Sequence, residues 1–135
     1  MIQYIASDVE GTLLHGHATT LNPELFDIIR QLKEHGIHFI AASGLQYKNL
    51  QRLFAPVKDD ISYVAENGSM CVHDGKIVSL GHIDTDLIYE IADAAKEYGH
   101  CHTLISTART GYTDSQDPDY IDHIRNDVGY DMDIV

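Results

Sequence analysis

A short acidic segment directly follows the first apolar run of this sequence. Asp8-Val9-Glu10-Gly11-Thr12 comes after Ile2 to Ala6 and before Leu13-Leu14. A buried strand that stops at a turn-forming glycine places the preceding acid at the carboxyl edge of a sheet, where open α/β sheets bind their ligands. An ionised carboxylate can attack phosphorus and form an aspartyl-phosphate. We therefore predict that Asp8 is a nucleophile and that Glu10 is the proton carrier.

Gly11 and Thr12, which complete the segment, are suited to binding a phosphate group. Gly11 lets the backbone approach a phosphate group closely, and Thr12 adds a hydroxyl and an N–H at the turn. The alternative is a plain acidic turn, because strand ends often carry Asp and Gly.

The composition narrows the class of protein. At 135 residues with 44% hydrophobic residues, the chain has the size and apolar content of one globular domain. No apolar run approaches the roughly 20 residues of a membrane span, so no membrane partner is expected. The first residues lack a basic region typical of a signal peptide, which makes a cytoplasmic location the default expectation. Cys71 and Cys101 do not form a Cys-x-x-Cys pattern and suit a reducing compartment.

The charge points to a metal ion. The formal net charge is −12, which repels nucleic acid and excludes it as an expected partner. A phosphorylated substrate would also be repelled, so a local hard cation held by carboxylate oxygens is required. We therefore predict Mg²⁺ as the cofactor.

Three βα units are expected in the first half of the chain. A helix begins at Asn22-Pro23 and runs to about His35, and Gly36 ends it. Ile37 to Ala42 and Ile61 to Ala65 are apolar strands, with a helix between them. Right-handed crossovers place the ends of all three strands on one edge, so Asp8, Ser43 and Asn67 should converge.

The second half of the chain is patterned differently. The sequence predicts a hairpin around Asp74-Gly75 and an amphipathic helix from Asp84 to Tyr98. Short strands at His100 to Ser106 and Thr110 to Thr113, a helix from Pro118 and an extended end follow.

The motifs together resemble the haloacid dehalogenase (HAD) superfamily. Asp8-x-Glu10-Gly11-Thr12-Leu13-Leu14 is followed by Ala42-Ser43-Gly44 after the second strand and Glu66-Asn67-Gly68 after the third. The order resembles the Cof-type branch of sugar-phosphate and nucleotide phosphatases, whose α/β cap follows the third strand and hairpin. The resemblance implies an α/β fold with two parts. Residues 1–81 would form a partial Rossmann-like core, with a parallel three-stranded sheet, flanking helices and a β-hairpin. Residues 82–135 would form the first half of an α/β cap.

The resemblance also implies roles for individual residues. Asp8 would be the phosphate acceptor and a magnesium ligand, with the backbone carbonyl of Glu10 as another ligand. Ser43 would hold the phosphoryl group by its hydroxyl, together with the Gly44 N–H, and donors at a helix N-terminus suit that charge. Ser43 could equally be a plain helix cap. Asn67 could bind substrate or merely accept a left-handed turn.

Three departures from the family pattern bear on activity. Glu10 stands where the family has Asp, and a displacement of about 1 Å can cost on the order of 100-fold in rate. Leu45 stands where the branch has Arg. The chain ends at Val135, inside the expected cap, and the family's later Lys and acidic Gly-Asp motif have no counterpart, so activity should be impaired.

The expected function is hydrolysis of a small phosphorylated metabolite in the presence of Mg²⁺. The alternative is a catalytically inactive binding or assembly module, and a receiver-type signalling domain ranks last because its acceptor follows the third strand.

Strand edges and apolar helix faces left uncovered by an incomplete fold predict a homo-oligomer. The histidine pairs His15/His17 and His100/His102 lack a third ligand, so solvent-facing side chains are expected there rather than zinc sites.

Overall fold

The chain is described by a computed structural model that covers residues 1–16 and 18–135. It divides into two compact units, Met1–Gly81 and His82–Val135. None of the helices in the described residues is long and apolar enough to cross a membrane.

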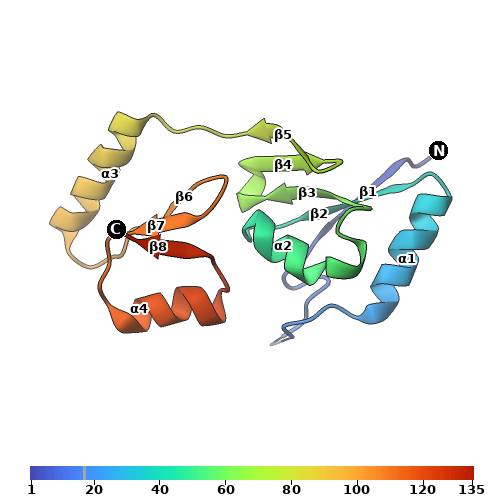
Figure 1. Ribbon diagram of the computed structural model, residues 1–135, viewed down its shortest axis with the longest axis horizontal. Coiled ribbons are helices and arrows are strands. Elements are labelled where there is room, and N and C mark those ends of the chain that lie inside the picture. Colours follow the sequence, from blue (N-terminus) through green and yellow to red (C-terminus); the bar gives the residue numbers. More distant parts are fainter. Residues whose placement is uncertain (17) are drawn as a thin grey trace. The chain divides into compact units, whose positions relative to one another are not determined.

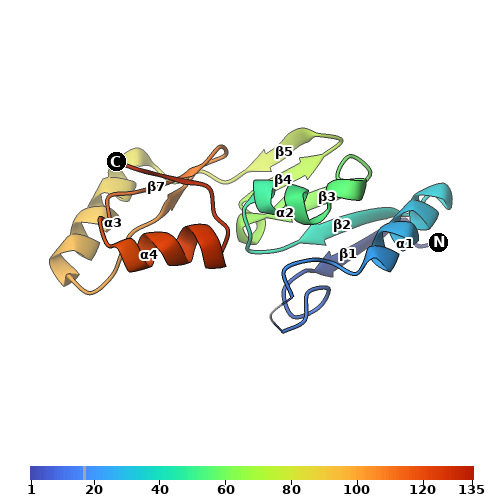
Figure 2. The ribbon, with the colours of Figure 1, turned by 60° about the horizontal axis from the view of Figure 1, so that its bottom comes forward.

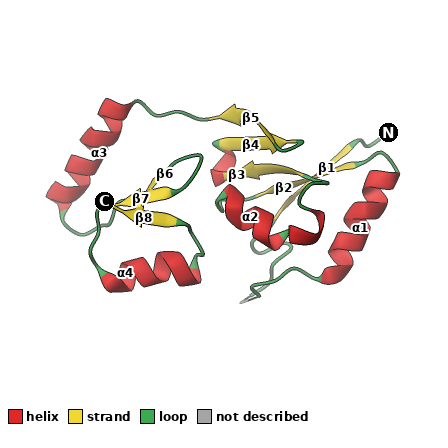
Figure 3. Ribbon diagram, in the orientation of Figure 1, coloured by secondary structure: helices red, strands yellow, loops and turns green. Residues whose placement is uncertain are grey.

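Unit 1 alternates strands with helices and then adds a hairpin (Figures 1 and 3). Its elements are β1 (Tyr4–Asp8), α1 (Pro23–Glu34), β2 (His38–Ala42), α2 (Tyr47–Leu53), the 3₁₀ turn η1 (Ala55–Val57), β3 (Ser62–Ala65), the 3₁₀ turn η2 (Glu66–Gly68), β4 (Met70–His73) and β5 (Lys76–Leu80). The strands form one sheet in the order β1-β2-β3-β4-β5. β1, β2 and β3 are parallel, and β4 and β5 are antiparallel. The predicted α/β fold is confirmed, and the hairpin extends the parallel sheet.

The start of α1 follows from its sequence. The Asn22 side chain accepts a hydrogen bond from the Glu24 N–H at 3.0 Å, and Pro23 occupies the first helical position. The helix ends at Glu34, and Gly36 follows the cap residue His35 with a left-handed φ of +73° that suits glycine.

The helices of unit 1 cover one face of the sheet. α1 contacts both β2 and η1, and α2, which directly precedes η1, contacts β3. On β2 the alternate residues Phe39 and Ala41 are buried, and the Phe39 ring lies 6.2 Å from that of Phe54. The buried core of unit 1 comprises Val9, Leu21, Ile29, Phe39, Ala41, Leu50, Phe54, Val57, Ile61, Tyr63, Ala65, Met70 and Val72.

The first strand differs from its prediction in position and burial. The sequence places a buried strand at Ile2 to Ala6, whereas β1 spans Tyr4–Asp8 and Tyr4 is 63% exposed. β1 is an edge strand that pairs only with β2. The pairing of Tyr4 with His38 through Asp8 with Ala42 sets its bounds, and this register is not visible in the apolar pattern.

Unit 2 is smaller and less buried (yellow to red in Figures 1 and 2). It contains α3 (Thr85–Tyr98), β6 (Ile105–Ser106), β7 (Gly111–Thr113), α4 (Pro118–Asp122), a π-helical turn η3 (His123–Asp127) and β8 (Met132–Ile134). The sheet order is β6-β7-β8, with the first pair antiparallel and the second parallel.

One predicted strand in unit 2 is much shorter than expected. Of His100 to Ser106, only Ile105–Ser106 is a strand. Two side chains of this segment bond to the loop after β7 instead. Thr103 donates to Asp114 at 3.3 Å, and a ring nitrogen of His102 lies 2.9 Å from the Ser115 hydroxyl oxygen. The segment is therefore held by side chains rather than by a sheet ladder.

Candidate functional site

The ends of the three parallel strands of unit 1 lie at one edge of the sheet. Asp8, the last residue of β1, pairs with Ala42, the last residue of β2, and Ala42 pairs with Val64 near the end of β3. The predicted convergence of Asp8, Ser43 and Asn67 at this edge therefore holds for the backbone positions. Their roles stay predictions.

The turn after β1 is anchored on a buried residue. The carbonyl oxygen of Val9 accepts the N–H groups of Leu13 and Leu14 at 2.9 and 2.8 Å, and the Val9 side chain is fully buried. Gly11 has a φ of +78°, a left-handed conformation that side chains disfavour, and its N–H donates to the Leu14 carbonyl at 2.8 Å. The turn holds the acids beside the sheet edge.

The carboxylate of Asp8 has one contact from its own turn. The Thr12 hydroxyl donates to Asp8 Oδ2 at 3.4 Å, which is long for a hydroxyl hydrogen bond. Asp8 and Thr12 are both exposed. The side chain predicted as the nucleophile is thus accessible and only weakly restrained.

The second predicted acid makes a short hydrogen bond at the site. The Ser43 hydroxyl donates to Glu10 Oε2 at 2.6 Å and joins the end of β1 to the end of β2. The Ser43 oxygen accepts the Leu45 N–H at 2.9 Å, and the Ser43 N–H donates to the Val64 carbonyl at 2.9 Å. Ser43 is buried, whereas Glu10 is exposed. Two hydrogen bonds thus fix this buried hydroxyl, and a third holds the backbone of Ser43 to β3.

Asn67 lies against Gly44. A Cβ at position 44 would stand 3.0 Å from Asn67 Oδ1, closer than side chains normally approach. The Asn67 N–H also donates to the Ser43 carbonyl at 3.2 Å. Three consecutive left-handed residues, Glu66, Asn67 and Gly68, turn the chain here, with φ values of 53°, 55° and 90°. The absence of a side chain at Gly44 thus leaves room for the side chain of Asn67.

The donors present suit magnesium in chemistry, and water and substrate phosphate would complete its coordination. The Asp8 carboxylate and the Glu10 backbone carbonyl are oxygen ligands of the kind that Mg²⁺ binds, and Mg²⁺ often takes one or two carboxylates with water and substrate phosphate. Within residues 1–16 and 18–135, no group of three or more His, Cys, Asp or Glu side chains is placed to hold a metal ion. His17, one of the histidines in the two pairs, lies outside the described residues.

Two polar networks outside the strand ends contain partners that the sequence did not indicate. In unit 1 the Ser62 hydroxyl lies between His38 Nε2 at 2.8 Å and His73 Nδ1 at 2.7 Å. Burial, and secondarily the His73 ring, lowers the pKa of His38 from its ordinary value. Side chains alternate between the two faces of a strand, so His38 and His73 both lie on the sheet face opposite Phe39. This alternation is the sequence signal that could have indicated their contact.

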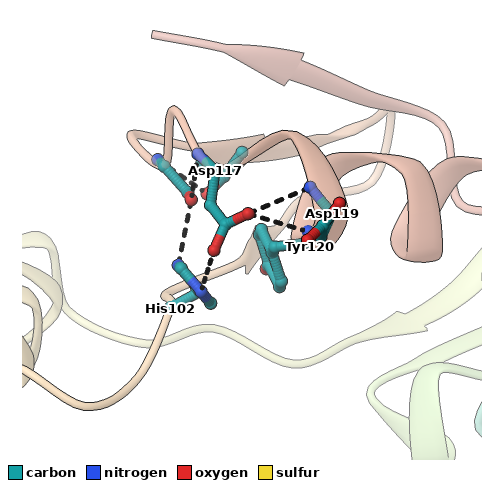
Figure 4. A network of polar contacts seen from close by, with 6 residues as sticks. His102, Asp117, Asp119 and Tyr120 are labelled. Carbon is teal, nitrogen blue, oxygen red and sulfur yellow. Dashed lines mark hydrogen bonds and ion pairs between the residues drawn. The ribbon is translucent and has the colours of Figure 1, made fainter.

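The second network closes the start of α4 (Figure 4). Asp117 accepts the N–H groups of Asp119 and Tyr120 at 2.9 and 3.4 Å, and its other carboxylate oxygen lies 3.4 Å from His102 Nε2. The His102 ring stacks on Tyr120 with 4.3 Å between ring centroids. Asp117-Pro118 was the sequence signal for this cap, and the partner His102 was not foreseen.

The strand order and the turns that follow the strands define a Rossmann-like α/β core with two acids, a hydroxyl and an amide at one edge of its sheet. The sequence profile of the haloacid dehalogenase-like hydrolases matches residues 5–134. The chain belongs to this family.

Among known proteins, the chain is similar to the 5-amino-6-(5-phospho-D-ribitylamino)uracil phosphatase YbjI of Escherichia coli (strain K12). The two are 35% identical over 92 residues, which is 68% of this chain and 34% of YbjI. A solved structure from Eubacterium rectale matches with a TM-score of 0.89 and 25% identity over 99% of this chain and 51% of that chain. SMU.1108c from Streptococcus mutans UA159 matches with a TM-score of 0.86 and 23% identity over 100% of this chain and 51% of that chain. The chain thus spans about a third of the length of YbjI and half of these structures.

Proposed function

We propose that this chain carries the phosphate-handling motifs of a Mg²⁺-dependent phosphohydrolase of the Cof-type branch. The substrate would be a phosphate monoester of a small metabolite. The meeting of these groups at one sheet edge carries the proposal: Asp8 at the end of β1 pairs with the end of β2, and the Ser43 hydroxyl oxygen lies 2.6 Å from Glu10 Oε2. The name of the E. coli relative, a phosphatase of a phosphorylated ribitylaminouracil, supports the substrate class.

The proposed reaction has two steps. An Asp8 carboxylate oxygen attacks phosphorus, the bond from phosphorus to the ester oxygen breaks, and Glu10 gives a proton to the departing alkoxide. Water then attacks phosphorus in the aspartyl-phosphate, Glu10 takes a proton from that water, and inorganic phosphate leaves with the Asp8 carboxylate restored.

The remaining residues would orient the phosphoryl group and neutralise its charge. Ser43 and the Gly44 N–H would donate to its oxygens, with Gly11 and Thr12 lining the other side and Asn67 contacting the substrate. Mg²⁺, held by Asp8 and the Glu10 carbonyl, would supply positive charge against the phosphate.

Association with another copy is part of the proposal. β1 and β5 are the two edges of the unit 1 sheet, and α3 has no buried residue while Leu87, Ile91 and Tyr98 are each about half exposed or more. Such uncovered edges and apolar side chains favour a homo-oligomer. Light scattering at micromolar concentration should give a mass above that of one chain, and a stable monomer would contradict this part.

A phosphatase assay tests the catalytic part. We expect hydrolysis of p-nitrophenyl phosphate with Mg²⁺ to be slow, because Glu10 stands where the family has Asp and its longer side chain displaces the carboxylate. Asp8→Asn should lower the rate by roughly a thousandfold or to background, since loss of a nucleophile is rarely compensated. Asp93→Asn, which alters an exposed acid of α3, is the matched control.

A second readout does not depend on turnover. Acid quenching during incubation with acetyl phosphate should trap one phosphoryl group, and peptide mass spectrometry should place it on Asp8. Equal rates for the parent and Asp8→Asn, with no phosphoryl group on Asp8, would favour the inactive binding or assembly module instead.

A further inference from the structure

The hydroxyl that should receive the phosphoryl group is already in use. A serine hydroxyl has a single proton to donate, and that of Ser43 goes to Glu10 Oε2 at 2.6 Å. Its oxygen also accepts the Leu45 N–H at 2.9 Å. In this arrangement Ser43 cannot donate to a phosphoryl oxygen.

The contact with Glu10 is of the strong kind. A separation of 2.6 Å falls in the range of a hydroxyl that donates to an ionised carboxylate. A carboxylate oxygen and a phosphoryl oxygen are both anionic acceptors, so Glu10 offers Ser43 what a phosphate would offer. The extra methylene of glutamate over aspartate extends the reach of the carboxylate across the sheet edge from the turn after β1.

We propose that Glu10 is an internal competitor for the phosphate cradle, so that a phosphate monoester binds at Ser43 only by displacing the Glu10 carboxylate. This inference rests on the proposed function and adds a control on substrate binding at the same site. Glu10 is exposed and can turn away, whereas Ser43 is buried and held by the backbone of Leu45 and Val64. The glutamate is therefore the partner that moves.

Displacement would also order the events of the reaction. While Glu10 accepts from Ser43, its carboxylate is held at the cradle and is not free to serve the leaving group. An oxyanion that takes over the Ser43 hydroxyl releases Glu10 towards the substrate, where its carboxylate takes up a proton from solvent before it serves the leaving group. Occupation of the cradle and placement of the acid would thus be one coupled event.

Binding of tungstate, an oxyanion of tetrahedral shape, tests the competition without added metal and without turnover. Isothermal titration calorimetry on the whole chain should show that Glu10→Ala binds tungstate about tenfold or more tightly than the parent, because a hydroxyl donor to an anion becomes available. Glu34→Ala, which removes an exposed acid at the end of α1, should leave the affinity unchanged.

A double-mutant cycle separates competition from a general charge effect. With Ser43→Ala, the gain from Glu10→Ala should largely disappear, because the hydroxyl for which tungstate competes is gone. Ser43→Cys, which keeps a side-chain atom at the position of the hydroxyl oxygen but is only a weak donor, replaces Ser43→Ala if the latter unfolds, as judged by circular dichroism. The same gain with and without the Ser43 hydroxyl would overturn the competition.

The remaining outcomes are also decisive. Tungstate binding to the parent with no gain in Glu10→Ala would overturn the competition but leave the phosphate cradle of the proposed function intact. Absence of binding to the parent and to every variant would overturn the competition, and the Asp8 assay with Mg²⁺ would then decide the proposed function. A gain that requires the Ser43 hydroxyl would support the competition even if the Asp8 assay shows no turnover.

Discussion

Two neighbouring isoleucines of α1 give a sharp test of how unit 1 is held together. Ile29 is 1% exposed and belongs to the core behind the sheet, whereas Ile28 is 51% exposed. Both lie in the interior of the same helix, so substitution by alanine changes helix propensity equally. The difference between Ile29→Ala and Ile28→Ala therefore reports burial alone.

The expected magnitudes follow from that difference in burial. Ile29→Ala removes buried carbon atoms and leaves a cavity, which should lower the free energy of unfolding by about 2–5 kcal/mol. Ile28→Ala should change the free energy of unfolding by no more than about 0.5 kcal/mol, with a small gain from the better helix propensity of alanine. Such a loss for Ile29→Ala is a large part of the roughly 5–15 kcal/mol that stabilises an ordinary domain.

Urea unfolding followed by far-UV circular dichroism measures both variants. The chain has no tryptophan, and each compact unit contains helices, so two transitions are possible and only the one that involves unit 1 should shift. Equal losses for the two variants, or a loss below about 1 kcal/mol for Ile29→Ala, would refute the assignment of α1 as the cover of the sheet.

Two further predictions concern the polar networks. Burial, together with the His73 ring, lowers the pKa of His38 in the folded state, so the unfolded state binds more protons and the free energy of unfolding should fall as the pH drops below about 6.5. In urea titrations at several pH values, His38→Gln should reduce this loss of unfolding free energy at low pH, whereas the exposed His82→Gln should not. Identical slopes of unfolding free energy against pH for the parent and His38→Gln would contradict the lowered pKa of His38 as the cause. Asp117→Ala should cost about 1 kcal/mol by removing the cap of α4, measured as faster amide exchange at Asp119 and Tyr120. Unchanged exchange at those two amides would show that the cap contributes nothing.

The sequence was sufficient to predict much of unit 1, because the relevant signals are local. Asn22-Pro23 and Gly36 bracket α1, and the apolar runs before Ser43 and Glu66 are β2 and β3. Given parallel strands, the meeting of Asp8, Ser43 and Asn67 at one edge follows from chain direction alone. These predictions needed no knowledge of which side chains touch.

The sequence could not predict features that depend on register and on distant partners. β1 lies at Tyr4–Asp8 because pairing with β2 selects those residues, and β6 is only two residues long because His102 and Thr103 bond to a loop. Both outcomes depend on contacts between segments far apart in the chain, which local propensity does not contain.

The amino-acid sequence by itself thus determined which chemical groups stand at the ends of the strands: two acids, a hydroxyl and an amide. Only the tertiary structure decided that the Ser43 hydroxyl donates a hydrogen bond to Glu10 across a separation of 33 residues. The physical reason is that a hydrogen bond needs its two atoms within about 3 Å. Strand register and side-chain rotamers set that distance, and neither can be read from the order of residues.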